Sequence, residues 1–239
     1  MPAPVSLSKL LRSAPFDQLS PDLSARFEEQ CELVRYELGA RLLSPQQQPP
    51  GLLVVLQGEV RLMASLSNGR TISLDRRGPG QLLGWVSLLR AAPCELVQAS
   101  ETCVCLLVPA SLLLESWRQC GGFLQFFTNR STASELASVL LDHFRELLAP
   151  PADEEAWLRQ ALERSRIVSV AGELPADLAA DASQRLLLSS ACGPDGPATG
   201  ALLPPGPLPS LPSGLPLRLL CCPAYLIDPY ARPGAARVV

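Results

Sequence analysis

The sequence has few of the residue types on which enzyme active sites depend. Its 239 residues contain one lysine, Lys9, and one histidine, His143. A phosphate-loop NTPase needs a lysine directly after its glycines, whereas Lys9 has no glycine nearby. His143 falls in a helical pattern, where a structural residue on the helix surface is expected rather than a catalytic base. Because a nucleophile, a base and an orienting group cannot be assembled, we expect no enzyme.

Metal ligands and membrane-spanning segments are also missing from the sequence. No two of the cysteines have Cys-x-x-Cys spacing, so we expect neither a metal site nor a bound cofactor. The N-terminus has no signal-peptide pattern, which favours a cytoplasmic protein with free thiols. The longest apolar stretches, 52–56 and 103–114, are far shorter than the ~20 residues of a spanning helix, so no membrane insertion is expected. The cysteines are Cys31, Cys94, Cys103, Cys105, Cys120, Cys192, Cys221 and Cys222.

The charge balance argues against nucleic acid as a partner. The formal net charge is −3, the isoelectric point is near 5.3, and the arginines are scattered along the chain. Apolar residues make up 47% of the chain, enough for one core, and the 24 prolines predict a part that is poor in regular structure.

The segment from Cys31 to Pro109 has the pattern of an antiparallel β-structure. Short apolar runs are separated by turn signals, of which Gly58-Glu59, Ser67-Asn68-Gly69 and 77–80 are the clearest. About eight short strands in this length predict a jelly-roll-like β-roll. The expected strands are 33–37, 41–44, 52–57, 59–66, 70–75, 81–84, 95–100 and 103–108.

Helices are expected on both sides of these strands. Ser20 is a suitable N-cap for a helix over 21–31, and helical periodicity returns in 111–119, where Trp117 is expected in the core. A long amphipathic helix is predicted over 131–148. Its apolar stripe could cover its own roll or pair with a second copy of the chain to form a homodimer.

The C-terminal part is expected to be less regular. Prolines 150 and 151 end the long helix and mark a boundary between 8–149 and 150–239. Beyond it we expect a helix near 153–165, strand-like segments at 166–170, 185–190 and 216–222, and an irregular stretch rich in proline and glycine at 193–216. Residues 150–239 are therefore interpreted as a linker or a partial second module.

Three motifs within residues 8–148 resemble the cyclic nucleotide-binding domain. Tyr36-Glu-Leu-Gly39 looks like the family's early strand and turn, and 53–62 is similar to its strand, glycine, strand signature. Residues 80–89, Gly-Gln-Leu-Leu-Gly-Trp-Val-Ser-Leu-Leu, fall where the family has its phosphate-binding cassette. The resemblance implies a mainly β fold with flanking helices, a β-roll of about eight strands with an N-terminal helix and C-terminal helices.

In that family, amides at the start of a short helix face the cyclic phosphate, a glutamate binds the ribose and an arginine neutralises the phosphate. Here Trp85 matches the glutamate and Cys94 matches the arginine, with the anionic Glu95 beside it. Arg90 could replace the arginine if its side chain reaches inward. The candidate binding residues are Gly84, Trp85, Val86, Ser87, Arg90, Cys94 and Glu95.

Three interpretations of this cassette stay open. The first is a degenerate pocket that is filled by Trp85 and retained only for docking to a neighbour, and the second is a sensor pocket for an altered ligand that is not a nucleotide. The third is a true receptor for cyclic AMP or cyclic GMP that uses the cassette amides and Arg90. Cys103 and Cys105 lie on one face of a strand and are expected to be small core residues.

The context of the domain is suggested by a second resemblance. Residues 83–90 with 93–95 look like a divergent branch at the N-terminus of bacterial peptidase-containing ABC exporters, and 196–202 and 215–220 resemble the segment that joins the parts of those proteins. This implies a regulatory module whose partner is an ABC exporter or its peptidase. No helix-turn-helix pattern follows the long helix, which disfavours a transcription factor.

Overall fold

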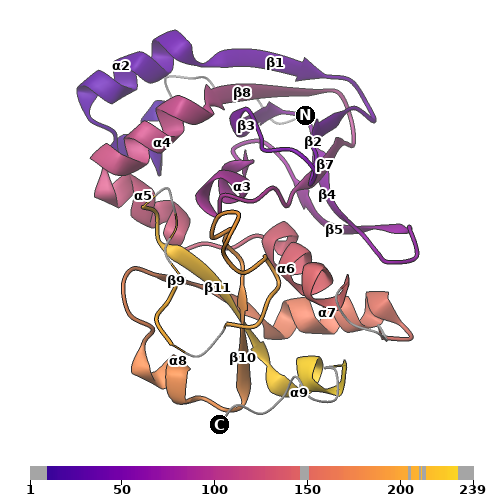
Figure 1. Ribbon diagram of the computed structural model, residues 1–239. Coiled ribbons are helices and arrows are strands. Elements are labelled where there is room, and N and C mark those ends of the chain that lie inside the picture. Colours follow the sequence, from indigo (N-terminus) through magenta and orange to yellow (C-terminus); the bar gives the residue numbers. More distant parts are fainter. Residues whose placement is uncertain (1–9, 146–150, 204–205, 210, 212–213, 231–239) are drawn as a thin grey trace. The chain divides into compact units, whose positions relative to one another are not determined.

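The computed structural model describes residues 10–145, 151–203, 206–209, 211 and 214–230 (Figure 1). Lys9 and the end of the predicted long helix, 146–148, lie outside the described residues. The chain divides into two compact units. Unit 1 comprises Met1–Met63, Ser73–Leu89 and Pro93–Arg130, and unit 2 comprises Ala64–Ile72, Arg90–Ala92 and Ser131–Val239. This division differs from the expected boundary near residue 150.

The strands of the predicted β-roll form two antiparallel sheets of four strands each. The first has the order β1 (Glu32–Tyr36), β8 (Cys103–Pro109), β3 (Gly51–Gln57) and β6 (Leu82–Leu83). The second has the order β2 (Arg41–Leu43), β7 (Leu96–Ala99), β4 (Val60–Ser65) and β5 (Thr71–Arg77). The bounds of these strands follow the predicted ones closely, and the predicted fold class is confirmed.

The core of the roll follows from the side-chain pattern of its strands. Buried and part-exposed residues alternate along β4, whereas nearly every residue of the central strand β3 is buried. Cys103 and Cys105 are core residues, as expected. The φ of Gly58 is +86°, and a Cβ there would lie 2.5 Å from the carbonyl oxygen of Thr102, so only glycine fits this turn. The cluster inside the roll comprises Leu42, Leu43, Leu53, Val55, Val60, Leu62, Leu83, Val97, Ala99, Cys103 and Cys105.

Helices of unit 1 carry an aromatic cluster. They are η1 (Phe16–Gln18), α2 (Pro21–Gln30), α3 (Trp85–Leu89), α4 (Ala110–Gln119) and α5 (Gly121–Thr128). The Oγ of Ser20 accepts a hydrogen bond from the Leu23 amide, which confirms the predicted N-cap of α2. Trp117 is 1% exposed and its ring lies 5.3 Å from that of Phe127, so it is a core residue, as predicted. Sequence periodicity did not predict α5.

Unit 2 is built on a three-stranded antiparallel sheet of order β10, β11, β9. The strands β9 (Arg166–Val170), β10 (Gln184–Leu188) and β11 (Leu217–Pro223) match the three strand-like segments expected there. Its helices are α6 (Ala133–Arg145), α7 (Glu154–Arg164), α8 (Ala176–Ala180), α9 (Ala224–Ile227) and the short η2 (Asp228–Tyr230). The central strand β11 is buried along almost its whole length.

Helix α6 is part of unit 2 because its apolar stripe packs there, against α7 and β10. Leu136, Val139, Leu140 and Phe144 are all buried. A homodimer through this helix stays a prediction, and the stripe expected to form it is covered within the chain. His143 is buried rather than on the helix surface, because the Gly200 loop covers it and its Nδ1 lies 2.9 Å from the Gly200 carbonyl oxygen.

The proline-rich stretch 193–216 has irregular backbone, as expected, but several of its described leucines are packed. Leu211 is buried in a cluster with residues of β9, β10 and β11, and Leu203, Leu208 and Leu215 contact the same cluster. Residues 204–205, 210 and 212–213 lie outside the description. The stretch therefore completes the core of unit 2.

Candidate functional site

The cassette segment runs from β6 through Gly84 into the short helix α3. The φ of Gly84 is +83°, and a Cβ there would lie 2.7 Å from the carbonyl oxygen of Gly51 on β3. Only glycine can hold this position without displacing the strand. The turn brings the Gly84 amide and the Ser87 hydroxyl to the same side chain, that of Glu95.

Glu95 occupies the polar centre of the cassette. Its Oε1 accepts a hydrogen bond from the Gly84 amide at 3.0 Å, and its Oε2 accepts one from the Ser87 hydroxyl at 2.9 Å. The side chain is almost completely buried, at 2% exposed. Burying a carboxylate is costly unless donors surround it, and these two donors are provided by the cassette itself. The sequence predicted an anionic Glu95 beside the position of the arginine, but not that its carboxylate would accept hydrogen bonds from the cassette.

Ser87 and Cys94 complete this polar centre. The Ser87 Oγ accepts a hydrogen bond from the Cys94 amide at 3.2 Å while it donates to Glu95. The Cys94 Sγ lies 3.5 Å from the same oxygen. A neutral, buried thiol therefore stands where the resemblance requires an arginine guanidinium. The contact of Ser87 with Cys94 joins α3 to the residues that lead into β7.

Trp85 and Val86 are buried as well, so neither offers a surface to a ligand. The ring of Trp85 lies 5.4 Å from that of Phe127 on α5. Its indole is thus part of the aromatic cluster on the helices. The interior of the roll contains the aliphatic and cysteine cluster described above.

Arg90 belongs to unit 2 and is fully buried there. Its Nε donates to the carbonyl oxygen of Ser189 at 2.6 Å, and its Nη1 donates to the Ser138 hydroxyl on α6 at 3.2 Å. Both of these acceptors belong to unit 2, as Arg90 itself does. Four of the candidate residues form one hydrogen-bonded group: Gly84, Ser87, Cys94 and Glu95. Trp85 and Val86 are buried residues of α3. Arg90 is hydrogen-bonded to residues of unit 2.

Sequence reasoning missed a buried ion pair in unit 2. The Nη2 of Arg218 on β11 lies 2.7 Å from the Oε2 of Glu135 on α6, and both side chains are 0% exposed. The Nε of Arg218 and the Ser189 hydroxyl both donate to Glu135 Oε1. No signal in the sequence pairs two residues so far apart. This network fixes α6 to the sheet of unit 2.

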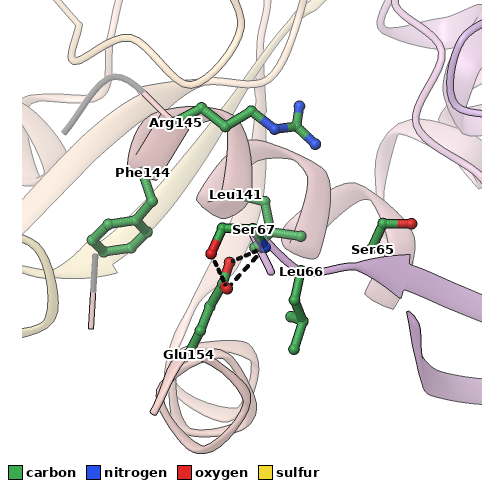
Figure 2. A pocket seen from close by; sticks show the side chains of 7 residues that line it. All are labelled: Ser65, Leu66, Ser67, Leu141, Phe144, Arg145 and Glu154. Atoms are coloured by element: carbon green, nitrogen blue, oxygen red, sulfur yellow. Dashed lines mark hydrogen bonds between the residues drawn. The ribbon is translucent and has the colours of Figure 1, made fainter. Parts of the chain in front are cut away.

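A cavity of about 390 Å³ lies beside the tip of the β4–β5 hairpin, within unit 2. Its polar wall is Glu154 on α7, whose carboxylate accepts hydrogen bonds from the amide and the hydroxyl of Ser67 (Figure 2). The guanidinium of Arg145 points away from that carboxylate, and Leu141 and Phe144 form apolar walls. Glu154 thus holds the hairpin tip, and its acceptors are already engaged.

The described residues contain neither a group of three or more ligating side chains that could hold a metal ion nor a helix that is long and apolar enough to span a bilayer. The hydrogen bonds described above join Glu95, Arg90 and Glu154 to neutral groups, and they join Glu135 to Arg218. In the cassette, the Gly84 amide and the Ser87 hydroxyl both donate hydrogen bonds to the Glu95 carboxylate.

Comparison with known proteins identifies the fold of unit 1. Residues 33–119 match the family model of the cyclic nucleotide-binding domain. This match contains the cassette and all eight strands of the roll, apart from the first residue of β1. The first part of the chain is thus a domain of the cyclic nucleotide-binding fold. No curated protein sequence matches the chain.

Solved structures with this fold are similar to about half of the chain. A regulatory subunit of a cAMP-independent protein kinase A from Trypanosoma brucei is 16% identical over 52% of this chain and 47% of its own, with a TM-score of 0.46. The catabolite activator protein of Thermus thermophilus is 21% identical over 50% of this chain and 55% of its own, with a TM-score of 0.42. The sensor domain of the transcriptional regulator DNR from Pseudomonas aeruginosa is 14% identical over 60% of this chain and 99% of its own, with a TM-score of 0.46. The chain thus spans about half the length of the first two of these proteins.

Proposed function

We propose that this chain is a non-enzymatic regulatory module of the cyclic nucleotide-binding fold whose cassette does not take a cyclic nucleotide. The observation that supports this most directly is the Glu95 carboxylate, hydrogen-bonded to the Gly84 amide and the Ser87 hydroxyl. A cyclic phosphate at these donors would meet a buried anion instead of an arginine. The missing charge-assisted contact alone is worth about 1.5–3 kcal/mol, one or two decades in affinity.

Calorimetry of the full chain with cyclic AMP and cyclic GMP tests this function. We expect no saturable heat with either ligand at concentrations up to about 1 mM. This range detects any binding with a free energy more favourable than about −4 kcal/mol. Saturation in the micromolar range would overturn the degenerate cassette. It would favour the receptor that uses the cassette amides and Arg90.

The regulated partner is proposed to be a peptidase-containing ABC exporter. The support is the resemblance of residues 83–95, and of 196–202 and 215–220, to segments of such exporters. The module would act by docking, because its cassette offers no open ligand site. Biolayer interferometry between the immobilised chain and a purified exporter encoded beside it tests this partner. We expect saturable binding of the exporter to the folded chain and none to the heat-denatured chain. The absence of binding at about 10 µM exporter would refute this partner.

A further inference from the structure

We propose that Glu95 is the residue that decides what the cassette accepts, because its carboxylate acts as a built-in ligand of the Gly84 amide and the Ser87 hydroxyl. This inference rests on the proposed function and adds the cause of the lost nucleotide binding. A degenerate site could simply lack the groups that bind phosphate. In this chain the binding groups are retained, and an anion from the same chain is bound to them.

The geometry supports a ligand rather than a chance contact. Each carboxylate oxygen has its own donor, at 3.0 Å from the Gly84 nitrogen and at 2.9 Å from the Ser87 Oγ. The Cys94 amide donates a hydrogen bond to the Ser87 Oγ, and the hydroxyl hydrogen of Ser87 is donated to Glu95. The hydroxyl thus acts as acceptor and donor at the same time. Gly84 holds its amide in place through a positive φ that other residues rarely adopt.

Because these residues are buried, the contact of Glu95 with Gly84 and Ser87 stabilises the cassette segment. Glu95, Ser87 and Gly84 are all buried, and β7 begins at the residue after Glu95. If the carboxylate were removed, the Gly84 amide and the Ser87 hydroxyl would lose their acceptor in a site that water does not reach freely. The start of α3 and the start of β7 are therefore held together by this side chain.

The test is replacement of the built-in carboxylate by a free one. Glu95→Ala removes the atoms that acetate supplies, a methyl carbon and a carboxylate, and leaves the donors in place. We expect Glu95→Ala to lower the Tm of the full chain by about 5–10 °C. Saturating acetate should restore about 3 °C or more of this loss, relative to chloride at equal ionic strength. Inorganic phosphate, which is larger, should restore less.

Two variants serve as controls for acetate. Glu95→Gln keeps the volume of the side chain but removes its charge and replaces one of the two acceptor oxygens by a carboxamide NH2, so it should lower the Tm less than Glu95→Ala and show no response to acetate. Glu101→Ala removes an exposed carboxylate of unit 1 and should behave as the unaltered chain. If Glu95→Ala does not fold, a Tm of Glu95→Gln equal to that of Glu101→Ala overturns the proposal.

The outcomes separate this inference from the proposed function. Acetate that stabilises Glu95→Ala no more than Glu101→Ala refutes the built-in ligand, and the unaltered chain can still fail to bind cyclic AMP. Saturable binding of cyclic AMP to the unaltered chain refutes the proposed function, whatever acetate does to the variant. Rescue of Glu95→Ala by acetate, with no nucleotide bound by the unaltered chain, supports both.

Discussion

Removal of one partner of the Glu135–Arg218 ion pair should destabilise unit 2 strongly. Both side chains are 0% exposed, and Arg218 reaches the two carboxylate oxygens through Nε and Nη2, each at 2.7 Å. Glu135→Gln leaves the guanidinium buried without its counter-charge, which in comparable sites costs about 3–5 kcal/mol. A loss of this size lowers the Tm of a domain of this length by roughly 10–20 °C.

Hydrogen exchange followed by mass spectrometry reads this loss in unit 2 alone, because peptides of β9 and β11 report on its central sheet. Glu155→Gln is the matched control, since Glu155 forms ion pairs with Arg70 and Arg159 at the surface, where such pairs are worth 0–1 kcal/mol at most. The variant Glu135→Leu with Arg218→Met should recover most of the stability, because an apolar pair needs no counter-charge. If the β9 and β11 peptides exchange as slowly in Glu135→Gln as in Glu155→Gln, the ion pair does not stabilise unit 2 in the way inferred from the structure.

Three further perturbations test local contacts. Iodoacetamide at pH 8 should label the part-exposed Cys120 long before Cys105, because burial raises the pKa of Cys105 to about 12; equal labelling in a mass spectrum would contradict its burial. The hydrogen bond from Arg26 lowers the pKa of Glu115, so the pair stabilises the fold above the ordinary glutamate pKa and loses that effect as pH falls through the lowered value. Glu115→Gln should flatten the fall of Tm below about pH 5, and an unchanged profile refutes the coupling. Glu154→Gln should speed hydrogen exchange in the hairpin tip, 64–72, and unchanged exchange would show that the tip is held by other contacts.

The β-roll could be predicted because its signals are local. Alternating burial, the Gly58 turn and the Asn68-Gly69 hairpin each act over a few residues, and the strands begin and end close to where these signals placed them. The strands of unit 2 were equally visible. The helix over 121–128 was not, because its paired glycines read as a break and its eight residues are too few for a long periodic pattern, although Phe123, Phe126 and Phe127 do follow helical spacing.

The candidate site was predicted in its residues but not in its contacts. The resemblance located Gly84, Ser87, Cys94 and Glu95, and local sequence indicates an anion where an arginine would be needed. That Glu95 turns toward Gly84 and Ser87 depends on how α3 packs, which no spacing rule encodes. The same limit applies to Arg90, whose acceptors are a hydroxyl on α6 and the carbonyl oxygen of Ser189, about a hundred residues away.

The receptor alternative would have to break contacts in both units. Glu95 would leave the Gly84 amide and the Ser87 hydroxyl, and Arg90 would leave the Ser189 carbonyl oxygen and the Ser138 hydroxyl. Hydrogen bonds to charged groups contribute about 1.5–3 kcal/mol each, so the four together oppose binding by roughly 6–12 kcal/mol. A micromolar affinity corresponds to a net binding free energy of about −8 kcal/mol, so the new contacts of the ligand would have to supply roughly 14–20 kcal/mol. For this reason each buried charge is better explained as a fixed part of its own unit than as a phosphate-binding group.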